Sequence, residues 1–329
     1  MIRTTFALVV ALALALPLAA CQPAPGAPAA PPGPSDAAVT LASLRRIDDH
    51  PLWTMTFHGG YDRYTGMAAK QPEFGCSLFT AHGDPANPLF ARNFDYPQQP
   101  ALLLFTAPPD GYASVSLVDT SNLGLTREVD FATEAGRQAL LNAPLLPYDG
   151  MNAKGLTIGM ATTPSAEPTR HADRGSAGGI RIMRLVLDEA ATVDEALAVF
   201  ERYNLDFTAG PPLHYLVADA GGQAAVIEFV DGVMVVHRQQ GPWQALVNFE
   251  LTGTGEPTRQ ADPRYATASR ALTASAGRLG PDQAMDLLAQ VRQGHTQWSV
   301  VYGQKTGEVR IATGRRYDTV HTFHLPMTG

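Results

Sequence analysis

The sequence predicts an α+β protein in which mainly antiparallel sheets are covered by helices on their outer faces. Two observations lead to this fold class. Short apolar, strand-like runs separated by turn residues recur from residue 52 to residue 314. Helical patterns occur as two pairs, in two separate parts of the chain.

The predicted strands are short and follow one another through turn signals. Gly221-Gly222 and Asp231-Gly232 each separate two of them and are typical of hairpins. The segment DGMNAKG is expected to be a turn before the strand LTIGMA. In chain order, we expect strands at 52–57, 76–83, 88–96, 101–107, 111–119, 156–161, 214–220, 224–230, 233–238, 244–250, 298–303 and 308–314.

The predicted helices are recognised by the residues that begin them. Thr192 and Glu195 have the spacing of a capping box, in which each side chain bonds a main-chain N–H of the first turn. Asp262 followed by Pro263 also favours a helix start. The expected helices cover about 178–190, Thr192 to about Tyr203, a segment that opens at Asp262-Pro263, and Pro281 to about Gln293.

The N-terminus has the pattern of a secretory signal over residues 1–20, with an early basic residue, an apolar core and then small residues. Leu18-Ala19-Ala20-Cys21 resembles the lipobox of bacterial lipoproteins, which implies cleavage before Cys21 and a lipid on its sulfur. An ordinary signal peptide with a chance cysteine is the alternative. Residues 21–40 are Pro/Ala-rich, and we expect them to form an extended tether. These features predict a lipid-anchored protein of the bacterial cell envelope, on the periplasmic or extracellular face.

The composition of the whole sequence bounds its function. A hydrophobic content of 45% and a charged content of 17% are typical of a globular protein. The net charge is −7 and the sequence has no basic cluster, which argues against nucleic-acid binding. HExxH and CxxC motifs, EF-hand loops and phosphate-binding glycine motifs do not occur. We therefore expect no metal and no cofactor.

Cys76 is the second of only two cysteines, so lipidation of Cys21 would leave it without a disulfide partner. A catalytic cysteine needs a group that accepts its proton, because the thiolate is the nucleophile. The surroundings of Cys76 lack the papain pattern of a cysteine–histidine protease. The other solution is a cut before Cys76, whose new α-amino group, with a pKa of about 7.7–8, could act as the base.

Two segments resemble a known family. CSLFTAHGDPANPLFARNFDY and DGMNAKGLTIGM are similar to the N-terminal nucleophile hydrolases that act on linear amides. This superfamily includes choloylglycine hydrolases, penicillin V acylases, acid ceramidase-like amidases and isopenicillin N acyltransferases. The resemblance covers roughly residues 50–325 and implies a four-layer αββα sandwich of two mainly antiparallel sheets flanked by helices.

The resemblance implies roles for three residues near the N-terminal end of the predicted catalytic domain, 76–329. Cys76 matches the nucleophile. Arg92 would favour its thiolate electrostatically, and Asp95 would accept a hydrogen bond from the thiol or the new ammonium. The alternatives are that Cys76 is a buried structural thiol and that Arg92 and Asp95 form a turn pair or a surface ion pair.

Later in the chain, the resemblance implies three more site residues. Asn248 would supply a side-chain N–H to the oxyanion, and Arg264 resembles the family's distal active-site arginine, with Arg270 as a rival. Thr162 stands where several relatives have the second oxyanion donor, so a backbone N–H could serve instead. As alternatives, Asn248 would be a turn residue and Arg264 a surface residue of a first helical turn.

These residues together predict a hydrolase that cleaves a linear, non-peptide amide through a cysteine thioester, after autocleavage between Gly75 and Cys76. Residues 41–75 would then be a propeptide or a small α subunit, retained in an α/β heterodimer; a higher oligomer is left open. The partner is a small-molecule amide whose acyl group the sequence does not identify. The alternatives are an acyltransferase with the same acyl-enzyme and a non-catalytic envelope lipoprotein of this fold.

Overall fold

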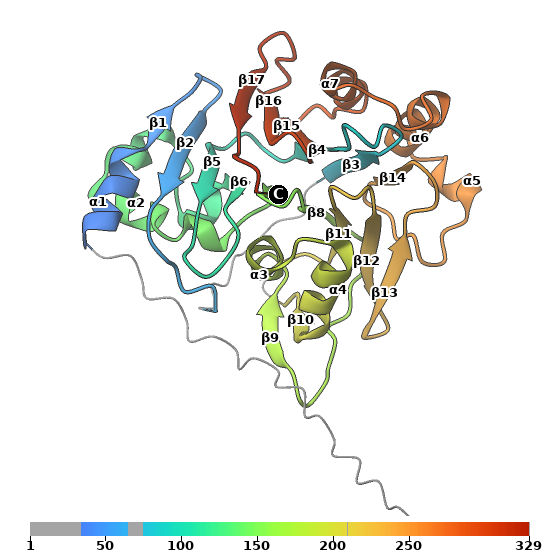
Figure 1. Cartoon of the computed structure of the whole chain (residues 1–329), viewed down its shortest axis with the longest axis horizontal. Coiled ribbons are helices and arrows are strands. Elements are labelled where there is room, and N and C mark those ends of the chain that lie inside the picture. Colours follow the sequence, from blue (N-terminus) through green and yellow to red (C-terminus); the bar gives the residue numbers. More distant parts are fainter. Residues whose placement is uncertain (1–33, 65–74, 209, 329) are drawn as a thin grey trace, which may run out of the picture.

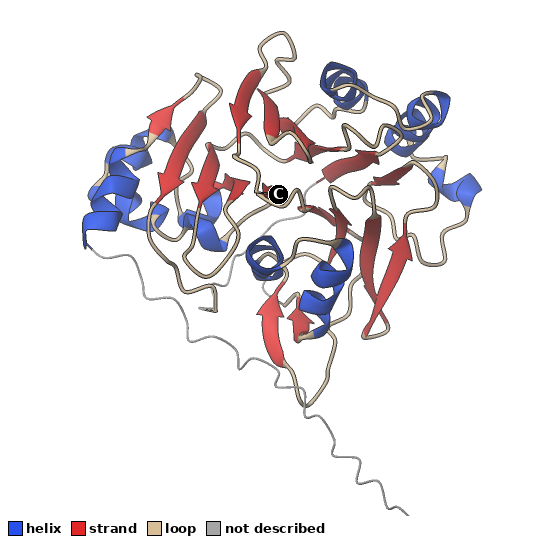
Figure 2. Cartoon of the chain, viewed as in Figure 1, coloured by secondary structure: helices blue, strands red, loops and turns tan. Residues whose placement is uncertain are grey.

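The computed structural model describes residues 34–64, 75–208 and 210–328. Within them, two large β-sheets lie face to face, and helices cover the outer side of each sheet (Figure 1). Coloured by secondary structure, the same view shows the strands in the middle and the helices around them (Figure 2). The arrangement is the predicted four-layer αββα sandwich.

The larger sheet has nine strands and is almost entirely antiparallel. Its one parallel neighbour pair is β2 with β5. In spatial order, its strands are β1 (Arg45–Arg46), β2 (Leu52–Phe57), β5 (Ala101–Thr106), β6 (Ser114–Asp119), β7 (Asp149–Asn152), β8 (Thr157–Thr162), β11 (Leu213–Ala218), β12 (Ala224–Val230) and β13 (Val233–Arg238).

The smaller sheet has six antiparallel strands and carries Cys76. Two further short strands, β9 (Gly175–Gly178) and β10 (Tyr203–Asp206), pair in parallel and form a separate sheet. In spatial order, the strands of the six-stranded sheet are β14 (Trp243–Leu246), β3 (Gly75–Ala81), β4 (Leu89–Asp95), β15 (Thr296–Gly303), β16 (Glu308–Thr313) and β17 (His321–His324).

The two predicted pairs of helices cover opposite sides of the sandwich (Figure 1). Helices α3 and α4 lie against the nine-stranded sheet, and α6 and α7 lie against the six-stranded sheet. The helices are α1 (Pro34–Ala42), α2 (Glu134–Leu140), α3 (Arg181–Glu189), α4 (Val193–Glu201), α5 (Glu256–Arg259), α6 (Pro263–Ala274) and α7 (Pro281–Gln290), with 3-10 turns at Thr120–Leu123, Glu128–Ala132 and Ala143–Leu145.

Alternation of side chains along β3 divides the core into two parts. Cys76 and Leu78 point into the large cluster that also contains Ile158 of β8. Phe79 lies on the opposite face, in the second cluster with Leu288 of α7. Successive strand residues point to opposite faces of a sheet, so one face of β3 is available to the inter-sheet space and the other to the helices. Cys76 lies on the inter-sheet face.

The helix starts follow the predicted capping. The Thr192 hydroxyl accepts a hydrogen bond from the N–H of Glu195 at 3.2 Å. The Asp262 carboxylate accepts from the N–H groups of Arg264 and Tyr265 at 2.8 and 3.2 Å. These side chains satisfy main-chain donors that have no partner inside the helix.

The segment before Cys76 belongs to the sandwich. Strand β2 pairs with β5 from Leu52↔Ala101 to Phe57↔Thr106, and β1 pairs with β2. The predicted tether differs from the structure at its C-terminal end, because residues 34–40 form most of α1, where Thr40 is fully buried. Proline fits the first helical turn, and alanine is the best helix former. The predictions for residues 1–33, including Cys21, lie outside the described residues.

Other differences concern short elements. The first four residues of DGMNAKG form β7 rather than a turn, and Asp149 and Asn152 are fully buried. Helix α7 ends at Gln290, three residues before the expected end. Helix α2 and strands β9, β10 and β17 were not predicted; Gly175–Gly178 lacks the branched and aromatic residues that indicate a strand.

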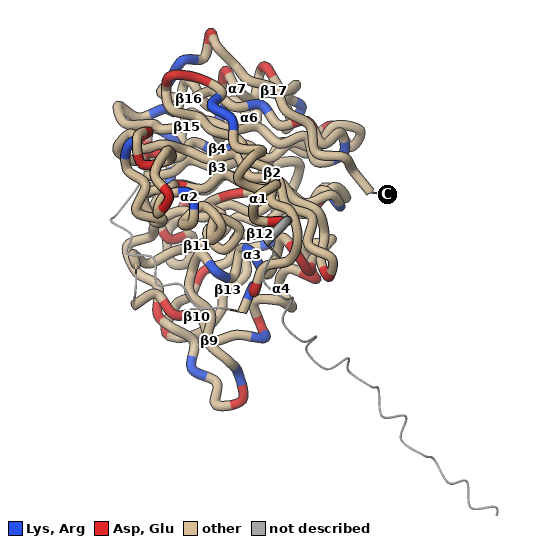
Figure 3. Tube along the Cα trace, turned by 90° about the vertical axis from the view of Figure 1, so that its left-hand side faces the viewer, with Lys and Arg blue, Asp and Glu red and all other residues tan. Residues whose placement is uncertain are grey.

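Charged residues of both signs are interspersed along the tube in Figure 3. In the part of the chain that the structure describes, no helix combines the length and the apolar character needed to span a membrane.

Candidate active site

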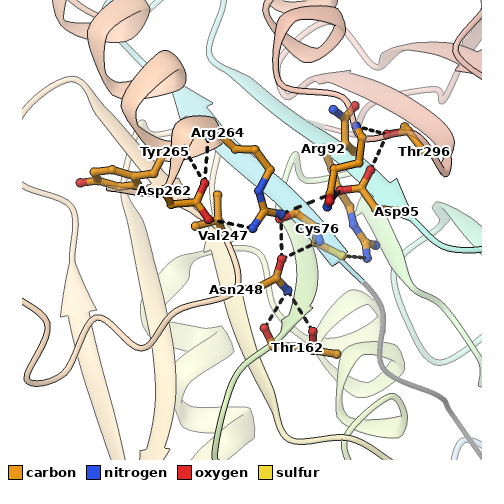
Figure 4. A network of polar contacts seen from close by, with 12 residues as sticks. Cys76, Arg92, Asp95, Thr162, Val247, Asn248, Asp262, Arg264, Tyr265 and Thr296 are labelled. Atoms are coloured by element: carbon orange, nitrogen blue, oxygen red, sulfur yellow. Dashed lines mark hydrogen bonds and ion pairs between the residues drawn. The ribbon is translucent and has the colours of Figure 1, made fainter. Parts of the chain in front are cut away.

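Cys76 is fully buried at the start of β3, and each of its polar atoms meets a different element (Figure 4). Its main-chain N–H donates to Asn248 Oδ1 at 3.0 Å. Its main-chain oxygen accepts from Arg264 Nη1 at 2.9 Å. Its Sγ lies 3.1 Å from Arg92 Nη2. Three of the sequence-predicted residues therefore contact the predicted nucleophile directly.

Arg92 reaches Cys76 from the neighbouring strand β4, where it is fully buried. Its Nη1 donates to the main-chain oxygen of Tyr148 and, at 2.7 Å, to Asp149 Oδ2. A buried guanidinium requires a paired charge and further hydrogen bonds to offset its desolvation. Asp149 supplies the charge from β7 of the facing sheet.

Asp149 is the most important site residue that the sequence analysis missed. Besides Arg92, it accepts hydrogen bonds from Trp298 Nε1 at 3.1 Å and from the Tyr302 hydroxyl at 2.5 Å. These donors come from β15, so the carboxylate ties the two sheets together beside Cys76. The sequence did contain one indication, because a buried Arg92 needs a carboxylate partner. It did not identify that partner, since the chain has many acidic residues.

Burial raises the pKa of the Cys76 thiol to about 11, although the nearby charge and hydrogen bond of Arg92 act in the opposite direction. At neutral pH, the thiol of the uncut chain is therefore protonated. The contact with Arg92 was expected to favour the thiolate. Its effect is outweighed here because desolvation disfavours any charged form. A proton acceptor is still needed for nucleophilic attack.

Asp95 lies at the end of β4, on the face opposite to Arg92. Its Oδ2 accepts from Gln293 Nε2 at 2.7 Å, and its Oδ1 accepts from the Thr296 hydroxyl. Arg264 Nη1 lies 4.0 Å from Oδ2. Asp95 is also the strand partner of Gly75. Its carboxylate therefore lies next to the predicted cleavage position, but its recorded hydrogen bonds go to Gln293 and Thr296 and not to the thiol.

Asn248 follows the end of β14 and links three other residues of the site. Its Oδ1 accepts from the N–H of Cys76 and, at 2.8 Å, from Arg264 Nη1. Its Nδ2 donates to the main-chain oxygen of Thr162 at 2.8 Å and to Thr162 Oγ1 at 2.9 Å. In the uncut chain, the amide thus presents its oxygen to Cys76 and its N–H group to Thr162.

Arg264, not Arg270, is the arginine of α6 that belongs to the site. Besides its contacts with Cys76 and Asn248, its Nη2 donates to Asp262 Oδ2 at 2.9 Å. The Asp262 carboxylate also caps α6, so the same residue begins the helix and orients the guanidinium. Arg270 is exposed on the same helix.

The contacts that the structure records for Cys76 include no histidine. His82 bonds to the oxygen of Gly222 and to Gln304, while His214 bonds to Val247 and lies near Glu228. Within residues 34–64, 75–208 and 210–328, no group of three or more His, Cys, Asp and Glu side chains could hold a metal ion. The site is therefore built from one thiol, two arginines, three carboxylates and amide or hydroxyl groups.

Comparison with known proteins identifies the family. The model of the linear amide C–N hydrolases, choloylglycine hydrolase family, matches residues 76–246. A penicillin V acylase from Pectobacterium atrosepticum is 26% identical over 192 residues, which cover 53% of this chain and 49% of that protein. The chain thus spans about half the length of this curated relative.

Solved structures support the fold. A penicillin V acylase from Agrobacterium tumefaciens has a TM-score of 0.54 and 19% identity, covering 76% of this chain and 86% of that one. A mutant conjugated bile acid hydrolase from Clostridium perfringens has a TM-score of 0.54 and 14% identity, with 76% and 92% covered. Since the family model matches more than half of the sequence, this chain belongs to the linear amide C–N hydrolases of the choloylglycine hydrolase family, within the N-terminal nucleophile hydrolases.

Proposed function

We propose that this protein hydrolyses a linear amide through a thioester on Cys76, after cutting its own chain between Gly75 and Cys76. One observation carries the proposal. The main-chain nitrogen of Cys76 is already held by Asn248 Oδ1 at 3.0 Å, beside a thiol that has no histidine partner among its recorded contacts. The family match, which begins at residue 76, supports the same position for the mature N-terminus.

In the proposed cut, Cys76 Sγ attacks the carbonyl carbon of Gly75. The bond between that carbon and the nitrogen of Cys76 breaks, and the nitrogen takes up the proton released by the thiol. Water then hydrolyses the Gly75 thioester, which releases a carboxylate and regenerates the thiol. The products are a chain that ends at Gly75 and a chain that begins with the free α-amine of Cys76.

The mature site would use that amine as its base. An α-amine has a pKa of about 7.7–8, so it can accept the thiol proton near neutral pH. The thiolate attacks the substrate carbonyl, and the α-ammonium returns a proton to the leaving amine. Water, deprotonated by the same amine, hydrolyses the acyl-enzyme. Arg92 is proposed to stabilise the thiolate, and Asn248 with Thr162 to bind the oxyanion.

Arg264 and Asp95 are proposed to position the other groups. Arg264 holds the main-chain oxygen of Cys76 and the side chain of Asn248, so it sets the distance between nucleophile and oxyanion donor. Asp95 would balance the charge of Arg264, from which it lies 4.0 Å away, and of the new ammonium.

The segment up to Gly75 is proposed to remain bound as a small subunit. Strand β2 would keep its ladder with β5 after the cut. At one end, Asp48 accepts hydrogen bonds from Thr313 at 2.7 Å and His321 at 2.8 Å. At the other end, Arg63 pairs with Asp110 and lies 3.5 Å from the buried Asp188.

The substrate is proposed to be a small amide whose acyl part is apolar or amphiphilic. The names of the similar proteins suggest penicillin V and conjugated bile acids as the first compounds to test. An acyltransferase would share the acyl-enzyme and pass the acyl group to an amine instead of water. The lipobox at Cys21 supports a lipid anchor in the cell envelope, and detergent phase partitioning of the wild type and Cys21→Ser tests it.

The deciding experiment combines mass and activity. Intact-mass analysis and N-terminal sequencing of the purified wild type should find a chain that begins at Cys76, and Cys76→Ala should abolish both this chain and amine release from an amide panel. Addition of an amine acceptor separates hydrolysis from acyl transfer. An uncut wild-type chain that is not acylated by any amide would instead favour a non-catalytic lipoprotein.

A further inference from the structure

A buried cluster of ionisable residues lies behind the loop that carries Asn248. Its centre is Glu228 of β12, which is 2% exposed. Glu228 Oε1 accepts from the N–H of Leu251 at 2.6 Å, and Oε2 accepts from the N–H and hydroxyl of Thr252 at 2.9 and 2.7 Å. His237 Nε2 lies 3.1 Å from Oε2, and His214 Nδ1 lies 3.4 Å from Oε1. Neighbouring strands and the loop thus converge on one carboxylate.

The arrangement requires Glu228 to be ionised. Burial alone would raise the pKa of its carboxyl, but the hydrogen bonds from His214, His237, Thr252 and Leu251 outweigh burial and hold it well below the usual range. A carboxylate that accepts several hydrogen bonds is strongly favoured over the protonated acid. The cluster therefore contains a permanent negative charge under the loop.

His214 connects this charge to the active site. It is fully buried on β11, and its Nε2 donates to the main-chain oxygen of Val247 at 2.8 Å. Its Nδ1 faces the Glu228 carboxylate. Because a carbonyl oxygen only accepts, Nε2 is the donor to Val247. A buried histidine–carboxylate pair thus ends on the peptide between Val247 and Asn248.

Residues 247–252, which we call the Asn248 loop, are thus held at both ends by this pair. His214 binds the carbonyl of Val247, directly before Asn248, and Glu228 binds the main-chain N–H groups of Leu251 and Thr252. The loop is not part of a strand, so no ladder hydrogen bonds fix it. These contacts hold the main chain on both sides of Asn248.

We propose that Glu228 and His214 are positioning residues for Asn248, and this rests on the proposed function of Asn248 at Cys76. They touch neither the thiol nor the substrate position. Their role is to hold the Asn248 amide between the nitrogen of Cys76 and Thr162. Small displacements of a group that binds a transition state can reduce the rate by about 10²-fold.

The test compares Glu228→Gln and His214→Gln with a matched control, His82→Gln. His82 is also buried, and its ring also bonds one main-chain oxygen and one side-chain oxygen, but it lies away from the Asn248 loop. We expect about 10- to 100-fold lower kcat for the two cluster variants, with KM within about twofold of wild type. His82→Gln should keep the wild-type kcat. If the two cluster variants do not fold, Thr252→Val is the milder test. It removes one hydrogen-bond donor to Glu228 and should lower kcat by a few fold.

A double-mutant cycle separates positioning from a general effect on the fold. In the Asn248→Ala background, Glu228→Gln should lower the single-turnover rate of Cys76 acylation no further, because its effect passes through Asn248. Equal losses in both backgrounds, or a kcat for Glu228→Gln equal to that of His82→Gln, would overturn the inference while the proposed function stands. A wild type that is never acylated at Cys76 would remove the proposed function itself, and the inference with it.

Discussion

Arg92 and Asp95 leave the same strand three residues apart and approach the Cys76 region from opposite faces of its sheet. Arg92 points between the two sheets, where it meets Cys76 Sγ and Asp149. On the opposite face, Asp95 accepts hydrogen bonds from Gln293, in the loop after α7, and from Thr296, the first residue of β15. Successive side chains of a strand point to opposite faces of the sheet, so residues three positions apart do as well. One motif thus brings a positive charge to the thiol and a negative charge to Gly75, the residue before Cys76.

The Arg92–Asp149 pair predicts a loss of stability when Asp149 is replaced. Both side chains are fully buried, and removal of one partner of such a pair leaves an uncompensated charge, which costs about 3–5 kcal/mol. Asp149→Asn should therefore lower the urea midpoint of unfolding and also the rate of amide hydrolysis. Asp194→Asn is the matched control because its partner Arg238 and Asp194 itself are solvent-exposed; we expect no measurable shift. Equal midpoints for the two variants would contradict the prediction.

Gly75 predicts a steric requirement at the cleavage position. A Cβ at this residue would lie 2.4 Å from Gln293 Nε2 and 3.1 Å from Asp95 Cβ. Gln293 could move away only by breaking its hydrogen bond with Asp95. Gly75→Ala should therefore slow self-cleavage, measured as the fraction of cut chain over time by mass spectrometry. Adding Gln293→Ala should restore part of the rate. Gly175→Ala, where a Cβ would meet no atom within 4 Å, should cleave as fast as wild type.

Local signals in the sequence predicted the strands, whereas the contacts of Cys76 with Arg92, Asn248 and Arg264 were expected from the family resemblance. Alternating apolar residues and turn residues located β3 and β4. The antiparallel pairing of these two strands then brings Arg92 next to Cys76. Asp149 and Gln293 were missed because their contacts join residues 57 and 198 positions apart. Local patterns contain no information about such partners.

The segment before Cys76 illustrates the limit of composition. Proline and alanine predicted an extended tether up to residue 40, yet α1 begins at Pro34 and buries Thr40. The Thr40 hydroxyl accepts from the N–H of His58 at 2.9 Å, a tertiary contact that favours the helix. Composition describes what a free chain prefers, whereas this contact depends on β2 being in the sheet.

The buried thiol predicts different titration before and after the cut. Burial raises the pKa of Cys76 to about 11 in the uncut chain, so the neutral thiol is the favoured form in the fold. This contribution to stability is complete below the unfolded pKa of about 8.5 and is lost as pH rises toward 11. In Cys21→Ser protein labelled with [3-¹³C]cysteine, the Cys76 signal of the chain that is still uncut, enriched by the slowly cleaving Gly75→Ala substitution, should titrate near pH 11. A midpoint below about 9 in the uncut chain would contradict the burial argument.

Arg264 predicts a catalytic loss that Arg270 does not share. Its hydrogen bonds to Cys76 and Asn248 are charge-assisted, and such bonds contribute about 1.5–3 kcal/mol each. Arg264→Ala should therefore lower kcat/KM at least about 10-fold, and Arg264→Lys should recover little because an ammonium cannot reproduce the planar fork. Arg270→Ala, on the exposed side of the same helix, should keep wild-type kinetics. If both alanine variants lose activity equally, Arg264 acts through the helix and not through the site.

Asp48 predicts that acid weakens the attachment of the proposed small subunit. Although burial acts to raise it, hydrogen bonds from Thr313, His50 and His321 lower the pKa of Asp48 below its ordinary value. A depressed pKa contributes stability above the unfolded value of about 3.9, and this is lost as pH falls through the folded value. The cut protein should keep its N-terminal chain at pH 7 and release it in acid, as measured by size-exclusion chromatography with mass detection.

The same clamp can be weakened at neutral pH by substitution. Asp48→Asn removes the charge that faces His321 and Arg316, so the N-terminal chain should dissociate at a lower urea concentration than in wild type. Asp49→Asn is the matched control, because Asp49 is a neighbouring aspartate that also bonds Arg316 but is 77% exposed. Once the pH has fallen through the lowered pKa of folded Asp48, wild type and Asp48→Asn should converge, since Asp48 is then protonated both in the bound and in the released N-terminal chain. Release that is independent of Asp48 at every pH would assign the attachment to the β2–β5 ladder alone.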